Sequence, residues 1–358
     1  MSAAGQPAAV AAFADLVELA GERVGGQVLG ASDEFFAPAE NLLRPGRGVF
    51  VPERYTERGK WMDGWESRRR RGPGHDWCVI RLGLPGVVRA VDIDTNHFLG
   101  NHPPFASLEA CEAPAGLAAA VLLRPPGPAA GTEEAAPRWR EVLPPVALRP
   151  GTQNLFALPV PCRATHVRLH IYPDGGVARL RVYGEVAPEP ELLSGEHLVD
   201  LAALASGGRV RACSDMFFGA ADNMLLPGRA AHMGEGWETR RRRGPGEDWA
   251  IVQLGAPGRI ERVEIDTHHF KGNYPERCAL EAAHLPGIRL VDLVAPGLAW
   301  RELLPECRLQ GDACHVFVNE LRELGPVTHV RLRIMPDGGV SRLRVFGRPV
   351  APPHAAQP

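Results

Sequence analysis

Two tetra-arginine runs carry the residue types needed to bind a small anion. "DGWESRRRRGPGHDW" spans Asp63–Trp77 and "EGWETRRRRGPGEDW" spans Glu235–Trp249, with twelve of fifteen positions identical. Guanidinium groups present forked donors that match a carboxylate. Alternate side chains of an extended segment share a face. The residues expected on the ligand-facing side are Glu66, Arg68 and Arg70 in the first run, and Glu238, Arg240 and Arg242 in the second.

The alternative for these arginines is structural. They would then be solvated, or would bridge sheets and a subunit interface. A nucleic-acid role is not expected, because carboxylates balance the arginines and the net charge is only −2.

A second repeated motif holds candidate acid and base groups. "IDTNHFLGNHPP" (Ile93–Pro104) matches "IDTHHFKGNYPE" (Ile265–Glu276). Histidine titrates near neutral pH, and a nearby carboxylate can orient its ring. The catalytic candidates are Asp94, His97, Asp266 and His269, with Asn101 and Asn273 as candidate ligand-binding amides. The alternative roles are a histidine satisfied within its turn, an aspartate that caps the loop, and an asparagine that supports a positive-φ turn.

The chain is an internal duplication with a shrinking offset between its halves. The offset is 182 residues at Ser32–Gly46, 172 at the arginine runs, and 163 at "HVRLHIYPDGGVARLRVYG", His166–Gly184. The first half therefore carries longer loops around Phe50–Lys60 and Ala115–Ala136. The expected organisation is a first repeat at 1–187, a linker at 188–194, a second repeat at 195–350 and a disordered tail at 351–358.

Short alternating runs closed by Gly and Pro predict strands in both halves. "DWCVIRLG" and "VVRAVDID" are expected to be separate strands, and the PDGG segments are expected to close hairpins. A helix is expected only around Ala11–Ala20. This pattern predicts an all-β protein with two tandem jelly-roll β-sandwich domains.

Composition indicates a globular protein, because 45% of the 358 residues are hydrophobic and 23% are charged. The seven cysteines lack CxxC spacing, which favours reduced thiols and a cytoplasmic location. No membrane or nucleic-acid partner is expected. No HExxH motif is present, so no metal ligand is assigned. The cofactor is unknown, and a divalent site assembled by loops from Asp94, His97 and His102 stays open.

The repeated GWE(S/T)RRRR, IDTxHFxGN and PDGGxxRLRVxG motifs resemble the signatures of the allantoicase family, from about Ser32 to Gly347. The resemblance implies two tandem repeats similar to the galactose-binding-like jelly roll. It also implies an oligomeric enzyme of purine degradation that hydrolyses allantoate to ureidoglycolate and urea. Two other classes remain open, namely a carbohydrate- or ligand-binding module and a structural interaction protein. The sequence does not indicate which repeat would be active.

Overall fold

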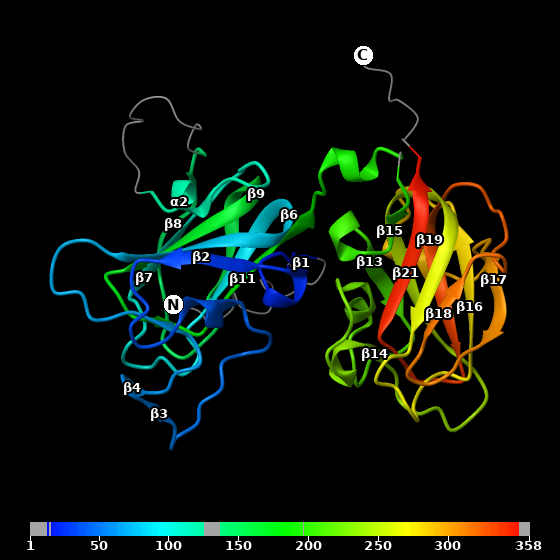
Figure 1. The fold of residues 1–358 in the computed structure, drawn as a ribbon, viewed down its shortest axis with the longest axis horizontal. Coiled ribbons are helices and arrows are strands. Elements are labelled where there is room, and N and C mark those ends of the chain that lie inside the picture. The colour runs from blue at the N-terminus through cyan, green and yellow to red at the C-terminus, as the bar shows by residue number, and fades with distance from the viewer. Residues whose placement is uncertain (1–12, 14–15, 125–136, 196, 351–358) are drawn as a thin grey trace, which may run out of the picture. The chain divides into compact units, whose positions relative to one another are not determined.

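The chain folds as two compact units, Met1–Ala187 and Pro188–Pro358, in a computed structural model. The structure describes residues 13, 16–124, 137–195 and 197–350. In Figure 1 each unit is built almost entirely of strands. The all-β, tandem-sandwich prediction is confirmed. The expected tail, 351–358, lies outside the described residues.

The first unit contains eleven described strands. They are β1 (Val17–Glu18), β2 (Gln27–Ala31), β3 (Tyr55–Thr56), β4 (Gly59–Lys60), β5 (Trp65–Glu66), β6 (Asp76–Asp94), β7 (Phe105–Cys111), β8 (Arg140–Ala147), β9 (Leu155–Tyr172), β10 (Gly176–Val177) and β11 (Arg179–Val186). Its short helices are η1 (Glu22–Val24), η2 (Ala39–Leu43) and α2 (Ala119–Leu122).

The second unit repeats this order, except that β3 and β4 have no counterpart among its described strands and two strands replace β9. Its described strands are β12 (Val199–Asp200), β13 (Arg209–Cys213), β14 (Trp237–Glu238), β15 (Asp248–Asp266), β16 (Arg277–Ala283), β17 (Arg301–Arg308), β18 (Cys314–Phe317), β19 (Val327–Met335), β20 (Gly339–Val340) and β21 (Arg342–Pro349). Its short helices are η3 (Pro190–Leu193), η4 (Leu204–Ser206), η5 (Ala221–Leu225), η6 (Met233–Glu235) and α3 (Leu290–Leu293). None of the helices in the described part of the chain has the length and apolar character needed to span a bilayer.

One long strand belongs to both layers of the first sandwich. Residues 76–81 of β6 pair with residues 166–171 of β9, and residues 78–81 also pair with β2. Residues 86–94 of β6 pair instead with β11 and with residues 155–164 of β9. The two runs predicted as separate strands are therefore one continuous element, β6, which contributes to each layer.

The core comes from the inward side of these strands. Val167, Leu169 and Ile171 of β9 are fully buried, as are Val91 and Ile93 of β6. Such period-two burial is what a sandwich strand requires.

Two local predictions are wrong. Strands β9 and β11 do not pair with each other, because β9 lies between β6 and β7 whereas β11 lies between β1 and β6. The PDGG segment is thus a crossover between layers and not a hairpin turn. Of the expected N-terminal helix, residues 11–12 and 14–15 lie outside the described residues; Phe13 is helical, but Val17–Glu18 is a strand paired with β11.

Candidate active site

The three repeated motifs meet around one cavity in the second unit. Its volume is about 500 Å³. The arginine run, the loop after β15 and the PDGG loop each contribute residues. The lining residues are Phe218, Glu238, Thr239, Arg241, Gly272, Asn273, Tyr274, Glu276, Pro336, Asp337 and Gly338. Motifs that lie far apart in the sequence thus converge where strands end, as binding groups commonly do.

Backbone hydrogen bonds hold these segments together. Strand β14 pairs with β20, with Glu238 opposite Gly339. The Thr239 amide donates to the Gly338 carbonyl at 3.1 Å, and the Gly339 amide donates to the Asn273 carbonyl at 2.8 Å. The cavity walls therefore depend on main-chain geometry.

The glycine pair of PDGG is required by this close approach. Gly338 has a φ of +137°, and a Cβ there would lie 2.7 Å from the Asn273 carbonyl oxygen. A Cβ on Gly339 would collide with the ring of Phe270, which is fully buried. Only glycine fits both positions.

Glu238 and Asn273 form a polar pair at the cavity. The Asn273 Nδ2 donates to Glu238 Oε1 at 2.6 Å. This bond uses one amide hydrogen and one carboxylate oxygen, so Asn273 Oδ1 and Glu238 Oε2 keep their acceptor capacity. Both residues were predicted to bind the ligand, and the structure brings them together.

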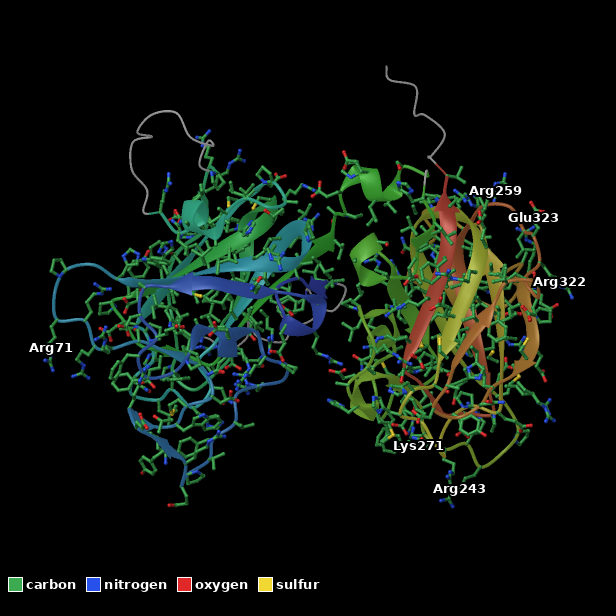
Figure 2. All side chains as sticks on the ribbon, viewed as in Figure 1. Arg71, Arg243, Arg259, Lys271, Arg322 and Glu323 are labelled. Atoms are coloured by element: carbon green, nitrogen blue, oxygen red, sulfur yellow. The ribbon has the colours of Figure 1, made fainter. Side chains whose placement is uncertain are left out.

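The arginines that alternate from Glu238 bind scaffold carboxylates. Arg240 Nε donates to Asp215 Oδ2 at 2.8 Å, and Arg242 Nη2 donates to Asp248 Oδ1 at 2.7 Å. Arg241 lines the cavity instead. The prediction that alternate side chains from Glu238 onward share one face is wrong, because the extended strand β14 ends at Glu238. Arg243 lies at the surface in Figure 2.

The first unit assembles the same contacts. Asn101 Nδ2 donates to Glu66 Oε1 at 2.7 Å, and the Gly176 amide donates to the Asn101 carbonyl at 2.8 Å. Arg68 Nε donates to Asp33 Oδ2 at 2.7 Å. Arg70 pairs with Asp76 through its guanidinium, and its backbone amide donates to Asp174 Oδ2 at 2.8 Å. In both units, then, the arginines named from the sequence hold the scaffold. Arg69 corresponds to Arg241.

The two units differ in their titratable groups. Burial raises the pKa of Glu66, partly offset by its hydrogen bond from Asn101. Tyr274 lines the cavity of the second unit and corresponds to His102 of the first. The Nδ1 atom of His102 is buried without a hydrogen-bond partner among the described atoms. Glu66 and His102 are therefore candidate acid and base groups of the first unit. From the sequence, His102 was considered as a metal ligand and, with His75 and His97, as one of the titratable groups that could make the first half catalytic.

The predicted Asp94–His97 pair does not form a hydrogen bond. Arg47 binds Asp94 through both carboxylate oxygens, at 2.9 and 3.0 Å, and the Asn96 amide donates to the same group. His97 has a φ of +68°, and its ring stacks on Phe50 with centroids 5.6 Å apart. The structure therefore gives Asp94 a loop-capping geometry.

The second copy behaves similarly. The Asp266 carboxylate accepts the His268 amide at 2.8 Å. His269 Nε2 lies 2.9 Å from the Ala230 carbonyl oxygen, to which it donates, and its backbone amide donates to Asp312. Neither Asp266 nor His269 is among the described residues that line the cavity.

Comparisons with known proteins agree with the duplication of the chain. An allantoicase repeat model matches residues 17–187 and 199–350. The chain is 51% identical to probable allantoicase 1 of Burkholderia mallei, over 92% of this chain and 94% of the relative. It is 49% identical to a probable allantoicase of Pseudomonas aeruginosa, over 96% and 98% of the two chains.

The chain belongs to the allantoicase family. A solved allantoicase structure from Saccharomyces cerevisiae has a TM-score of 0.77 and 35% identity, and the match covers 97% of this chain and 98% of that chain. Another solved structure, described as allantoicase, has a TM-score of 0.76 and 34% identity over 97% and 99% of the two chains.

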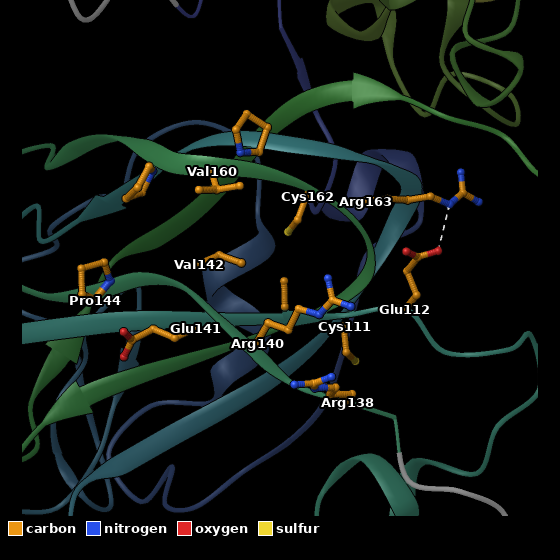
Figure 3. Close-up of a pocket in the computed structure, with 13 residues that line it drawn as sticks. Cys111, Glu112, Arg138, Arg140, Glu141, Val142, Pro144, Val160, Cys162 and Arg163 are labelled. Carbon is orange, nitrogen blue, oxygen red and sulfur yellow. Dashed lines mark hydrogen bonds and ion pairs between the residues drawn. The ribbon is translucent and has the colours of Figure 1, made fainter.

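A second cavity of this allantoicase-family chain lies apart from the repeated motifs. Its volume is about 440 Å³, and its lining includes residues of β7, β8 and β9 in the first unit. Figure 3 shows Arg163 paired with Glu112, at 3.1 Å, on one side of it. None of the predicted ligand-binding or catalytic residues lines this cavity.

The cavity of the second unit is also lined by residues that the sequence did not assign to a ligand. Arg241, Tyr274 and Asp337 line the cavity. All three lie within the repeated motifs, so the signal was present. Their orientation was not predictable, because it depends on where β14 ends and where the layers cross. Among the described residues, no cluster of three or more His, Cys, Asp or Glu has metal-binding geometry.

Proposed function

We propose that this protein hydrolyses allantoate to ureidoglycolate and urea at the meeting point of the three repeated motifs. The assignment of the reaction rests on family membership over nearly the whole chain. The convergence of those motifs on one cavity supports the place. In the reaction, the bond from the central carbon to one ureido nitrogen breaks. Water supplies the new C–O bond and a proton for the departing urea.

The ligand-binding groups match the substrate by type. Allantoate carries one carboxylate, for which Arg241 supplies forked donors in the second unit, with Arg69 at the corresponding position of the first. Its ureido groups carry both N–H donors and C=O acceptors. Asn273 and Glu238 can receive those N–H groups, because each keeps a free acceptor oxygen.

The first unit has the better acid and base groups. Burial favours the protonated form of Glu66, which can donate its proton to the departing ureido nitrogen. His102 Nδ1, which has no hydrogen-bond partner among the described atoms, can accept a proton from the attacking water. The second unit has Tyr274 in place of His102, so we assign the faster turnover to the first unit.

A direct assay tests the proposed function. Purified protein incubated with allantoate should release urea in proportion to the ureidoglycolate formed. The measurement is made both with and without added divalent metal. Binding of allantoate without urea release would contradict the hydrolase and favour a ligand-binding module, and absence of both would favour a structural role.

Replacing Arg241, which lines the cavity, together with its counterpart Arg69 should weaken substrate binding more than replacing the scaffold-bound arginines. The double variant Arg69→Ala/Arg241→Ala loses the proposed carboxylate contact, worth about 1.5–3 kcal/mol, so we expect kcat/KM to fall by roughly 10- to 100-fold, mainly through KM. The matched control is Arg68→Ala/Arg240→Ala, whose side chains are more than half exposed and bind Asp33 and Asp215. Steady-state kinetics of urea release distinguish the pairs. A larger effect in the control would restore the assignment made from the sequence.

A homo-oligomer and a cytoplasmic location are also part of the proposal. The assembly rests on the family resemblance, and the location rests on cysteine spacing together with seven free thiols. Light scattering of the purified protein measures the oligomeric state.

A further inference from the structure

A chain of three titratable side chains lies beside the proposed site of the first unit. His75 Nε2 lies 2.9 Å from His170 Nδ1, and His170 Nε2 lies 3.0 Å from Glu109 Oε2. Glu109 also accepts a bond from Arg168 Nη1 at 3.2 Å. The side chains come from β7, β9 and the residue before β6, so the chain joins three neighbouring segments of one layer.

The second unit has permanent charges at the same positions. The register aligns Glu109 with Arg168 in the first unit and Glu281 with Arg331 in the second. Where the first unit has His75 and His170, the second has Glu247 and Arg333. Arg333 donates to both oxygens of Glu247, at 2.7 Å each. The hydrogen bond with Glu247 raises the pKa of Arg333, so this guanidinium stays charged.

The hydrogen bonds between His75, His170 and Glu109 can persist after one proton is added to the two rings, but not after two. With both rings neutral, His170 donates to Glu109 and accepts from His75. One added proton can reside on His170, which then donates to both neighbours. When both rings are charged, an N–H group faces an N–H group, and the bond between His75 and His170 is lost.

The surrounding groups set the pH at which the hydrogen bond between His75 and His170 is lost. His75 is faced by His170 and Tyr172 of β9, with ring centroids 5.0 and 4.5 Å away, by Arg70 of the preceding loop, by Asp76 of β6, and by Glu109 of β7. Glu141 of β8 lies opposite Glu109 in the register. Burial lowers the pKa of His75, and His170 and Arg70 lower it further. The pKa of Glu109 is lowered by its bond with His170, so Glu109 stays charged in mild acid.

The hydrogen-bonded series His75–His170–Glu109 contacts two of the three segments that build the site. His75 ends the arginine loop, in which Arg70 binds Asp76 and donates its amide to Asp174. The ring of Tyr172, against which His75 packs, immediately precedes the PDGG loop. The Asp76 amide donates to the Pro173 carbonyl at 3.1 Å. A change at His75 is therefore transmitted directly to both loops.

We propose that His75 and His170 are positioning residues for the first unit's site, holding the arginine and PDGG loops at neutral pH and releasing them in acid. The loops are functional only insofar as the proposed hydrolysis is correct, whereas their release by acid does not depend on it. The direction of the pH dependence follows from the linkage between proton binding and folding. A histidine with a lowered pKa in the folded state leaves stability unaffected above about pH 6.5, and the folded state loses stability as the pH falls below that value.

Hydrogen exchange measured by mass spectrometry on the full chain tests the release. Segments 67–76 and 173–178 are compared with their counterparts 239–248 and 336–341, at about pH 8 and about pH 5. After correction for intrinsic rates, we expect exchange in the first unit's segments to accelerate about tenfold in acid, and in the second unit's by less than about twofold. Buried His166 and His329, one in each unit, both have pKa values of about 4 and affect the two units alike.

A graft within the same chain gives the matched control. His75→Glu/His170→Arg copies the Glu247–Arg333 pair into the first unit and should abolish the acid-dependent difference. The reciprocal Glu247→His/Arg333→His should create acid-dependent exchange in the second unit, and it serves if the first graft does not fold. Equal acid responses of the two units in the wild-type chain would overturn the proposal.

The pH profile of kcat/KM separates positioning from local stability. Each profile is normalised to the same protein's value at about pH 8. The graft should shift the acid limb of the profile to lower pH. An unchanged acid limb, despite altered exchange, would overturn the positioning role. If the wild-type chain releases no urea at any pH, the proposed function is wrong, and the exchange measurements alone decide whether the histidines hold the loops.

Discussion

Glu66→Gln lowers kcat for urea release by about 10²- to 10³-fold and leaves KM within about threefold. Glutamine keeps the shape of Glu66 and an oxygen that can accept the bond from Asn101 Nδ2. It cannot transfer a proton, and general acid catalysis contributes about 10²–10⁴ in rate. The effect should fall on kcat because proton transfer to the departing nitrogen occurs in the transition state.

The matched control for this prediction is Glu238→Gln in the second unit. Glu238 makes the same contact with Asn273 but faces Tyr274 instead of a histidine. We expect it to lower the activity of the whole chain less than twofold if the first unit does most of the turnover. Similar losses in the two variants would show two equivalent sites, and a loss confined to Glu238→Gln would assign catalysis to the second unit.

Asp63→Ala lowers the free energy of unfolding of the first unit by about 3–5 kcal/mol. The Asp63 carboxylate binds Arg179 Nη2 at 2.7 Å, and the two side chains are only 7% and 4% exposed. Asp63 also accepts the Val49 amide at 2.9 Å. Its removal leaves a buried guanidinium without its counter-charge, which is among the most destabilising changes in a folded protein. Guanidinium denaturation followed by tryptophan fluorescence measures the change.

Arg44→Ala is the control for that loss. Arg44 lies 3.7 Å from the other oxygen of Asp63, but its side chain is half exposed. Exposed ion pairs contribute about 0–1 kcal/mol, so unfolding should barely change. The bond from Arg179, the Val49 amide and the nearby guanidiniums lower the pKa of Asp63 against the opposing effect of burial. The wild-type chain should therefore lose this stability only as the pH falls below about 3.8. Equal destabilisation by both variants would show that the burial of Arg179 does not matter.

The sequence predicted the architecture well because duplication and alternation are local signals. Each half shows the same strand pattern twice, and Val167, Leu169 and Ile171 are buried as alternation requires. The sequence failed where pairing is non-local. A Pro-Asp-Gly-Gly segment is compatible with both a hairpin and a crossover, and only the pairing of β11 with β6 decides between them.

The site was predictable in its motifs but not in its geometry. Glu66 and Asn101 were both named from the sequence, and they form a hydrogen bond in the structure. The choice among the four arginines depended on an extended segment that ends at Glu66. Asp94 and His97 have the right chemistry and spacing. However, Arg47, forty-seven residues away, occupies the carboxylate, and short-range patterns do not report such a partner.

The counterpart of β9 in the second unit is divided into two strands, and this has a practical use for engineering the protein. In the first unit β9 runs unbroken from Leu155 to Tyr172, whereas the second unit has β18 and β19 with residues 318–326 between them. Residues 318–320 and 322–323 of this connection are exposed, and none of the connection lines the cavity. An exposed connection between strands tolerates added sequence. It therefore offers a point for opening the chain in a circular permutant, or for attaching a fluorophore that reports on the second unit alone.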